Sequence, residues 1–169
     1  MINNSDSEKI NIDKNTKDCA AVRVPPPLYF IFCLGIAFLL EYLFPVTSGR
    51  PALIIRVIIG GILIIASGCF AGSAFLVLIR NKTPFEPAKP TTMIVKDGPF
   101  RFSRNPMYLS LLILISGIAF LFCSIWQFIM IPVLFLLLHF CAVKPEESYL
   151  SLKFGEEYLA YKTRVRRWI

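Results

Sequence analysis

Four long apolar runs, separated by polar stretches, dominate the chain. They cover residues 28–44, 52–79, 107–122 and 125–141. The first is close to the shortest helix that crosses a bilayer, which takes about 17–25 residues, and the second is longer than the roughly 30 Å hydrocarbon core requires. The pattern predicts an all-α integral membrane bundle of about four transmembrane helices.

The connections between the runs predict two tight hairpins and one long loop. Residues 45–51 and the residues near 123–124 are short enough to join only antiparallel neighbours. Residues 80–104 form a connection of about 25 residues, in which three prolines between residues 84 and 90 prevent a continuous helix. A loop of this length in a compact bundle is typical of a functional segment.

Polar segments flank the four runs. Residues 1–24 are polar, and we expect them to form a cytoplasmic tail. Residues 25–169 would then form one membrane domain. Pro145 and the two acids after it predict a helix start. Gly155 breaks that helix and a second one follows, so the C-terminal helical segment covers about residues 145–167. One face of the second helix, at positions i, i+3 and i+7, is formed by Tyr158, Tyr161 and Val165.

Two features inside the helices predict packing contacts. Glu41 and Arg56 fall toward the same end of the first hairpin, where an ion pair would reduce the cost of isolated charges in lipid. Gly68 and Gly72 are four residues apart, a spacing that lets another helix approach closely. We expect that approach within the bundle rather than in a dimer.

Composition supports a membrane protein and argues against other classes. Of the 169 residues, 56% are hydrophobic and 17% are charged, which is too apolar for an ordinary soluble domain. The net charge of +7 comes from basic residues that flank the apolar runs and form no single stripe, so nucleic acid is a poor candidate partner. The five cysteines show no metal-ligand spacing, which predicts packing roles and no metal site.

The basic residues also predict an orientation. Six of them lie in residues 80–104 and six from residue 144 onward, whereas the turn at residues 45–51 holds one. Because basic loops stay in the cytoplasm, the long loop and both termini are predicted to be cytoplasmic.

The densest mixture of glycine, proline, arginine and aromatic residues lies at residues 96–108, directly before the third run. Asn105-Pro106 predicts a helix start, with Asn as the N-cap. Arg101 and Arg104 would then lie at the positive end of a helix, a place that favours an anion. Arginine beside a membrane helix is also an ordinary topology signal, and the sequence alone leaves both interpretations open.

Further polar side chains fall at the same end of the predicted bundle. They are Tyr108, His139, Lys144, Glu146 and Glu147. Each has an ordinary structural explanation, as an interface residue or a first-turn acid. Together they suit a soluble, charged cosubstrate that meets a lipid-soluble acceptor. No catalytic triad, phosphate-binding glycine loop or di-metal carboxylate pattern competes with this interpretation.

Three motifs in the last 80 or so residues resemble the isoprenylcysteine carboxyl methyltransferase family. They are G-P-F-R-F-S-R-N-P-M-Y at Gly98–Tyr108, P-E-E at Pro145–Glu147 and F-G-E-E-Y-L-A-Y-K-T-R-V-R-R at Phe154–Arg167. The wider group includes membrane enzymes that methylate phospholipid amines. The N-terminal half of the chain matches only as hydrophobic helices.

The resemblance implies S-adenosylmethionine as the methyl donor, bound on the cytoplasmic side under the C-terminal segment, and a lipid-like acceptor that enters from the membrane. Carried over by position, the donor-binding residues are Thr92, Met93, Ile94, Val95, Phe100, Arg104, Asn105, Pro106, Met107, Tyr108, His139, Glu146 and Glu147. The glutamates would hold the ribose hydroxyls or the methionyl ammonium, and Arg104 the methionyl carboxylate. Arg104, Tyr108 and Lys144 are the candidates for a direct part in the transfer.

Two positions depart from the family pattern. Asn105 stands where members commonly have His. The arginine that enzymes acting on prenylcysteine place shortly before the glutamate pair, to hold the substrate carboxylate, is missing from residues 139–144. Lys144 is the basic residue there, and a lysine ammonium cannot bind both oxygens of a carboxylate in the two-pronged way that an arginine does. This departure argues against prenylcysteine as the acceptor.

Three functions are therefore compared. The first is a membrane methyltransferase that acts on an amphipathic or lipid-like acceptor. The second is a phospholipid amine N-methyltransferase, and the third is a non-catalytic membrane protein that binds lipids or a partner. The acceptor, the atom methylated and the oligomeric state stay open from the sequence.

Overall fold

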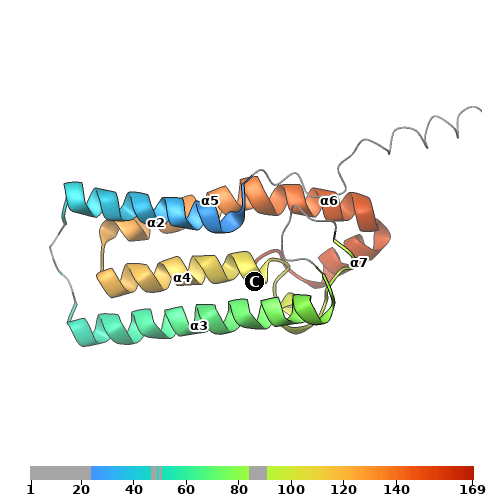
Figure 1. Cartoon of the computed structure of the whole chain (residues 1–169), viewed down its shortest axis with the longest axis horizontal. Helices are drawn as coiled ribbons and strands as arrows, with labels where there is room; N and C mark the ends of the chain where they lie inside the picture. Colours follow the sequence, from blue (N-terminus) through green and yellow to red (C-terminus); the bar gives the residue numbers. More distant parts are fainter. Residues whose placement is uncertain (1–23, 47–48, 50, 84–90) are drawn as a thin grey trace, which may run out of the picture.

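The computed structural model describes residues 24–46, 49, 51–83 and 91–169 (Figure 1). Its helices are α2 (Pro26–Leu43), α3 (Leu53–Arg80), η2 (Gly98–Arg101), α4 (Pro106–Phe122), α5 (Ile125–Leu138), η3 (His139–Val143), α6 (Lys144–Phe154) and α7 (Glu156–Arg164). These described residues contain no strand, so the all-α prediction is confirmed. Residues 1–23 of the predicted tail at residues 1–24, and the prolines between residues 84 and 90, lie outside the described residues.

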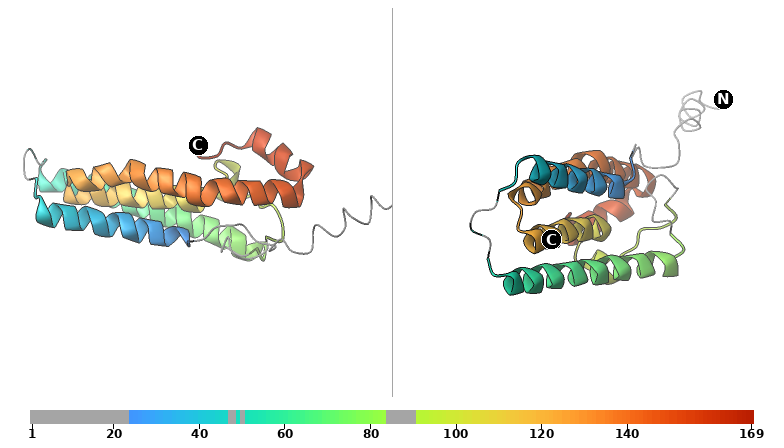
Figure 2. Two further views of the ribbon diagram at one scale, coloured as in Figure 1. Left: turned by 90° about the horizontal axis from the view of Figure 1, so that it is seen from above. Right: turned by 60° about the vertical axis from the view of Figure 1, so that its left-hand side comes forward.

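Helix α4 lies between α3 and the pair formed by α2 and α5 (Figures 1 and 2). Its most extensive contact is with α3, while α2 packs mainly on α5. The α2–α3 and α4–α5 connections lie at one end of the bundle, here called the hairpin end. The opposite end, here called the polar end, is formed by residues 91–105, α6 and α7.

The length and the surface of the helices fit a membrane protein. Helices α2 and α3 and the continuous helical stretch Ile125–Phe154 are long and apolar enough to cross a membrane, and Pro106–Phe122 is a shorter apolar helix. Large apolar side chains cover the outer faces of the bundle, as on α3, where Ile62 is 62% exposed and Ile65 is 68% exposed. A water-soluble monomer would not leave such faces uncovered, because each exposed aliphatic side chain would cost about 1.5–3 kcal/mol relative to burial.

The close α3–α4 contact depends on one pair of glycines. A Cβ atom at Gly60 would lie 2.8 Å from the main-chain oxygen of Gly117, and one at Gly117 would lie 3.0 Å from that of Gly60. By contrast, Cβ atoms at Gly68 and Gly72 would meet nothing within 4 Å. The prediction that Gly68 and Gly72 pack inside the bundle is therefore wrong, because both face outward along α3.

Among the residues that the structure describes at the hairpin end, Glu41 and Arg56 bind different partners. Arg56 donates hydrogen bonds from Nε and Nη2 to the main-chain oxygen of Leu121, at 3.1 and 2.7 Å. Glu41 accepts a 2.7 Å hydrogen bond from the Ser124 hydroxyl. The predicted Glu41–Arg56 pair is thus wrong. Arg56 instead binds a carbonyl at the end of α4, where the last turn leaves main-chain oxygens unpaired.

The fourth apolar run does not end where the sequence pattern ends. Helix α5 passes through a π-helical turn, η3, directly into α6, and Lys144 N–H donates to the oxygen of His139. Pro145 has no N–H, and its ring crowds the carbonyl four residues earlier, so a wider turn relieves the mismatch. Helix α6 thus begins at Lys144, beside the predicted start at Pro145, but it continues from α5 and η3 and has no free N-terminus.

Helix α7 folds back beside the polar end after a break at Gly155. Gly155 has φ +49°, a left-handed region that favours glycine, so the predicted break is confirmed. Tyr158 and Tyr161 are buried against Ile94, and Val165 packs at the edge of this cluster. The predicted face of this helix thus attaches the C-terminal segment to residues 91–105.

Candidate functional site

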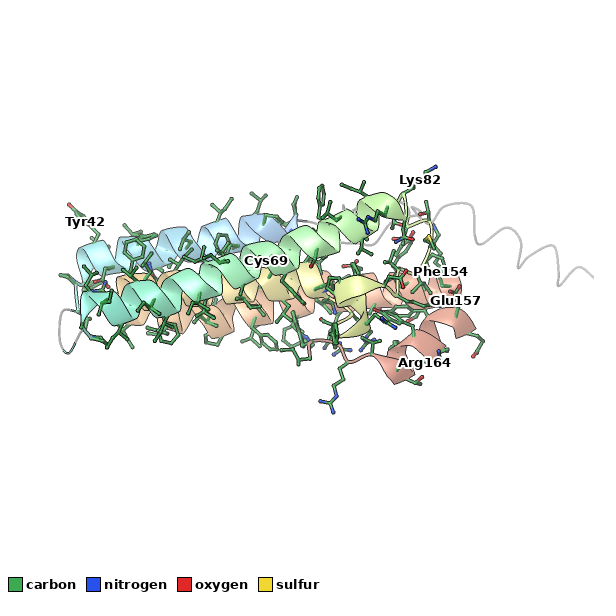
Figure 3. The ribbon with its side chains drawn as sticks, turned by 90° about the horizontal axis from the view of Figure 1, so that it is seen from below. Tyr42, Cys69, Lys82, Phe154, Glu157 and Arg164 are labelled. Atoms are coloured by element: carbon green, nitrogen blue, oxygen red, sulfur yellow. The ribbon has the colours of Figure 1, made fainter. Side chains whose placement is uncertain are left out.

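The polar end encloses a cavity of about 780 Å³, its open mouth included. The walls come from the end of α3, from residues 91–108, and from α6 and α7. Figure 3 shows Lys82, Phe154, Glu157 and Arg164 at this end of the molecule, with Tyr42 at the other. Segments that are far apart in the sequence thus form one site.

Most residues predicted for a donor site line this cavity. They are Met93, Ile94, Val95, Phe100, Arg104, Asn105, Pro106, Met107, Tyr108, Glu146 and Glu147. Thr92 shares a hydrogen bond with Thr83, whose side chain is part of the wall. His139 and Lys144 are not part of the lining. His139 stacks on Phe135 at 5.8 Å between ring centres, and the Lys144 ammonium lies 4.4 Å from the centre of the Phe140 ring.

The wall between residues 93 and 100 is held by a tight turn and by α7. Gly98 has φ +57° and lies so close to α3 that a Cβ atom would be 2.9 Å from Val77 Cγ2. Tyr161 donates a 2.7 Å hydrogen bond to the main-chain oxygen of Phe100. The chain turns at Gly98 and enters the short η2 helix.

Glu147 is the centre of a buried charge cluster. Arg167 donates from Nε to Oε1 at 3.0 Å and from Nη2 to Oε2 at 2.8 Å, a two-pronged contact. Arg104 Nη1 lies 3.2 Å from Glu147 Oε1. The side chains of Glu147 and Arg104 are only 8% and 9% exposed. Within the described part of the chain, Arg104 Nε and Nη1 have no hydrogen-bond partner.

Glu146 has a different environment from its neighbour. Its Oε2 accepts a 2.7 Å hydrogen bond from the Tyr108 hydroxyl. Both side chains are half-buried and line the cavity. Among the cavity-lining residues that the structure describes, Glu146 is therefore the carboxylate that no arginine holds. It can still accept hydrogen bonds from a ligand.

Two tyrosines of α7 complete the wall beside Arg104. Burial raises the pKa of Tyr161 to about 12, with the Arg104 charge opposing the effect. Burial also raises the pKa of Tyr158 further, and the Glu147 carboxylate adds to the shift. Both phenols therefore stay protonated at physiological pH, and Tyr161 donates its hydrogen bond to Phe100.

Asn105 does not cap α4 as the sequence predicts. The helix begins at Pro106 as expected, but the Asn105 side chain makes no capping hydrogen bond. Its Nδ2 donates instead to the main-chain oxygen of Arg167, at 3.0 Å. The same carbonyl also accepts a 3.4 Å hydrogen bond from the Ser103 hydroxyl, so two side chains before α4 bind the chain after α7.

The sequence prediction did not include several residues of the wall. They are Leu78, Thr83, Thr91, Leu150, Tyr158 and Tyr161. It also did not assign Arg167 to the site. The tyrosine spacing marks a buried helix face, but no local signal shows which segment that face covers. Arg167 lies in a basic cluster, where only the backbone path after α7 decides which arginine points inward.

The arrangement provides complementary groups for a zwitterionic ligand with an aromatic part. A buried guanidinium with unpaired nitrogens can bind a carboxylate. The Glu146 carboxylate can bind an ammonium or hydroxyl groups, and Phe100 with the tyrosines provides aromatic surface. The structure describes no group of His, Cys, Asp or Glu side chains in residues 24–46, 51–83 and 91–169 that could hold a metal ion.

Comparisons with known proteins match most of the membrane domain. The family model described as phospholipid methyltransferase matches residues 55–157, from α3 into α7. An uncharacterized protein of Haemophilus influenzae is 35% identical over 63 residues, which is 37% of this chain and the whole of that protein.

Proposed function

The chain belongs to the phospholipid methyltransferase family and is a membrane methyltransferase, and from this premise we propose that S-adenosylmethionine is its methyl donor and binds in the polar-end cavity. One observation carries the proposal. Three separated segments bring to one cavity a buried arginine whose Nε and Nη1 make no hydrogen bond to the described residues, a carboxylate without an arginine partner, and aromatic side chains.

Each part of the donor has complementary residues in this cavity. Arg104 would hold the methionyl carboxylate, since its Nε and Nη1 are buried without hydrogen bonds. Glu146 would hold the methionyl ammonium or the ribose hydroxyls, and Tyr108 keeps its carboxylate in place. Phe100 and the residues around Pro106 would contact the adenine.

When bound, the donor supplies a methyl group on an already activated sulfonium. The residues of this chain need only to align the acceptor with that methyl group and to exclude water. Arg104 and Tyr108 line the cavity and remain the candidates for direct contact with the reacting groups. Lys144 lies outside the lining, against Phe140. A direct role for Lys144 is therefore not part of this proposal.

The acceptor would be lipid-like or amphipathic, because the cavity lies at the end of a bundle with apolar outer faces. Arg104 is the one cationic side chain among the described lining residues. If it holds the donor carboxylate, no second cation remains to bind an acceptor carboxylate. This argues against prenylcysteine, and an amine-bearing phospholipid is the second candidate, which the family match favours.

Titration of S-adenosylmethionine and of its demethylated product, S-adenosylhomocysteine, into the purified protein tests the donor. Saturable binding of both is expected. Absence of binding would overturn the proposal and favour a non-catalytic, lipid-binding protein. Incubation with methyl-labelled S-adenosylmethionine and host lipid extract, followed by identification of the labelled product, then identifies the acceptor and the methylated atom.

A further inference from the structure

The last residues of the chain return from α7 to the bundle (Figure 2). Residues 166–169 are here called the terminal strap. Its main chain pairs with the residues directly before α4. Arg104 N–H donates to the oxygen of Arg166 at 3.1 Å, and Asn105 Nδ2 donates to the oxygen of Arg167 at 3.0 Å. The strap is thus bonded to the segment that supplies Arg104 to the cavity.

A second anchor of the terminal strap is Trp168. Its ring lies 5.1 Å from that of Phe135 and 6.4 Å from that of His139, measured between ring centres. It packs on the core cluster that contains Leu134 and Leu138. This contact accounts for His139, which the sequence places near the site but which packs against the strap instead of lining the cavity.

Between these anchors, Arg167 occupies both oxygens of Glu147. Glu147 Oε1 also forms a 3.2 Å ion pair with Arg104 Nη1, but Arg104 Nε and Nη1 make no hydrogen bond to the residues that the structure describes. Two arginines therefore share one buried carboxylate. The two-pronged contact of Arg167 satisfies the carboxylate, and Arg104 keeps free donors in the wall of the cavity.

We propose that Arg167 is a positioning residue of the donor site, which keeps the Arg104 guanidinium available to the carboxylate of the methyl donor by engaging Glu147. Without Arg167, both oxygens of Glu147 would be available to accept hydrogen bonds from Arg104 Nε and Nη1. The donor carboxylate would then lose its partner, although nothing that touches the donor had been removed. This inference rests on the proposed function of the cavity.

The test compares two ligands across matched variants by titration calorimetry in detergent or nanodiscs. S-adenosylhomocysteine carries an amino-acid carboxylate equivalent to that of the donor, and 5′-methylthioadenosine lacks the amino-acid part. Arg167→Gln should weaken S-adenosylhomocysteine binding by about tenfold to a hundredfold, the range for loss of a charged hydrogen-bond partner. Its effect on 5′-methylthioadenosine should be less than threefold.

Two further variants complete the design. Arg166→Gln is the matched control, because Arg166 has an exposed side chain and contributes its main-chain oxygen to the strap. Its affinities should equal those of the parent protein. Arg167→Lys keeps the positive charge but cannot make the two-pronged contact with Glu147. Its affinity for S-adenosylhomocysteine should therefore lie between that of the parent protein and that of Arg167→Gln. This variant also carries the test if Arg167→Gln does not fold.

Equal losses for both ligands would overturn the positioning role and leave Arg167 as a structural residue. Unchanged affinity for S-adenosylhomocysteine in Arg167→Gln and Arg167→Lys would overturn it as well. Failure of the parent protein to bind S-adenosylhomocysteine is a different outcome, because it overturns the proposed function itself and the positioning role with it.

Discussion

Glu146 and Glu147 are adjacent in the sequence but serve different purposes in the structure. Glu147 is 6% exposed and is bound by Arg167 and approached by Arg104. Glu146 is half-buried, bonded to the Tyr108 hydroxyl, and open to the cavity. An explanation of either one as a first-turn acid loses its basis, because the helix runs on from α5 and has no free terminus at Pro145.

Their substitution should therefore give different results. Glu146→Gln should weaken S-adenosylhomocysteine binding by at least about tenfold, since a charged hydrogen-bond partner is lost, with little change in melting temperature without ligand. Glu147→Gln should instead destabilise the protein by about 1–3 kcal/mol, because two arginines lose their shared carboxylate, and it should leave Arg104 available to the donor carboxylate. Calorimetric titration and thermal unfolding measure the two effects.

Glu156→Gln is the control for this pair, since Glu156 is an exposed acid of α7 outside the cavity lining. It should leave both affinity and melting temperature unchanged. If Glu146→Gln binds the ligand like the parent protein, the assignment of this carboxylate to the donor is incorrect.

At the scale of the elements, the α3–α4 contact sets the shape of the bundle and the position of the cavity wall. The two helices approach at Gly60 and Gly117, where main chain meets main chain. The same pair of helices carries Val77, against which Gly98 turns, and Pro106, where the cavity meets α4. Helix packing at mid-bundle is thus linked to the site through continuous, rigid helices.

A methyl group at this contact should be costly. In Gly117→Ala the new Cβ would lie 2.9 Å from Ile64 Cγ1 and 3.1 Å from Ile64 N, so the helices must separate. Overpacking of this kind costs about 1–3 kcal/mol. Gly68→Ala is the control, because its Cβ would meet nothing within 4 Å and should cause no loss of stability. Thermal unfolding in detergent measures the stability of both variants. Equal stability of Gly117→Ala and Gly68→Ala would contradict a close contact between α3 and α4 at Gly117.

At the scale of the whole molecule, the two ends of the bundle differ in chemistry. The polar end holds the cavity, the buried charges and the C-terminal helices, whereas the hairpin end holds short connections. Basic residues concentrate at the polar end. The positive-inside rule therefore predicts that the polar end and both termini face the cytoplasm, where a water-soluble methyl donor is available.

Cysteine labelling tests this orientation. Tyr42, at the hairpin end, is 83% exposed, and the Glu157 side chain, at the polar end, is 56% exposed (Figure 3). In a variant without the native cysteines, Tyr42→Cys should react with an impermeant reagent from outside the cell. Glu157→Cys should react only after the membrane is opened. Labelling of both positions from one side would contradict the four-span topology.

Much of the architecture followed from the sequence alone. The apolar runs predicted the bounds of α2, α3 and α4 to within a few residues, because the hydrophobic length of a span is a local property of the chain. The break at Gly155 and the turn at Gly98 were predictable for the same reason, since positive φ is a property of single residues. The motifs around Asn105-Pro106 and the glutamate pair pointed to the family that the comparisons then matched.

Only the tertiary structure decided which polar groups meet. Asn105 binds the carbonyl of Arg167 instead of capping its helix, and Arg56 binds the carbonyl of Leu121 instead of Glu41. The chain after α7 is extended, with φ −121° and ψ 130° at Val165, so Arg167 turns inward while Arg166 stays exposed. A hydrogen bond between residues 62 apart in the chain produces no pattern in the sequence of either segment. Each polar group has several possible partners, and the packing of the folded chain decides which of them it meets.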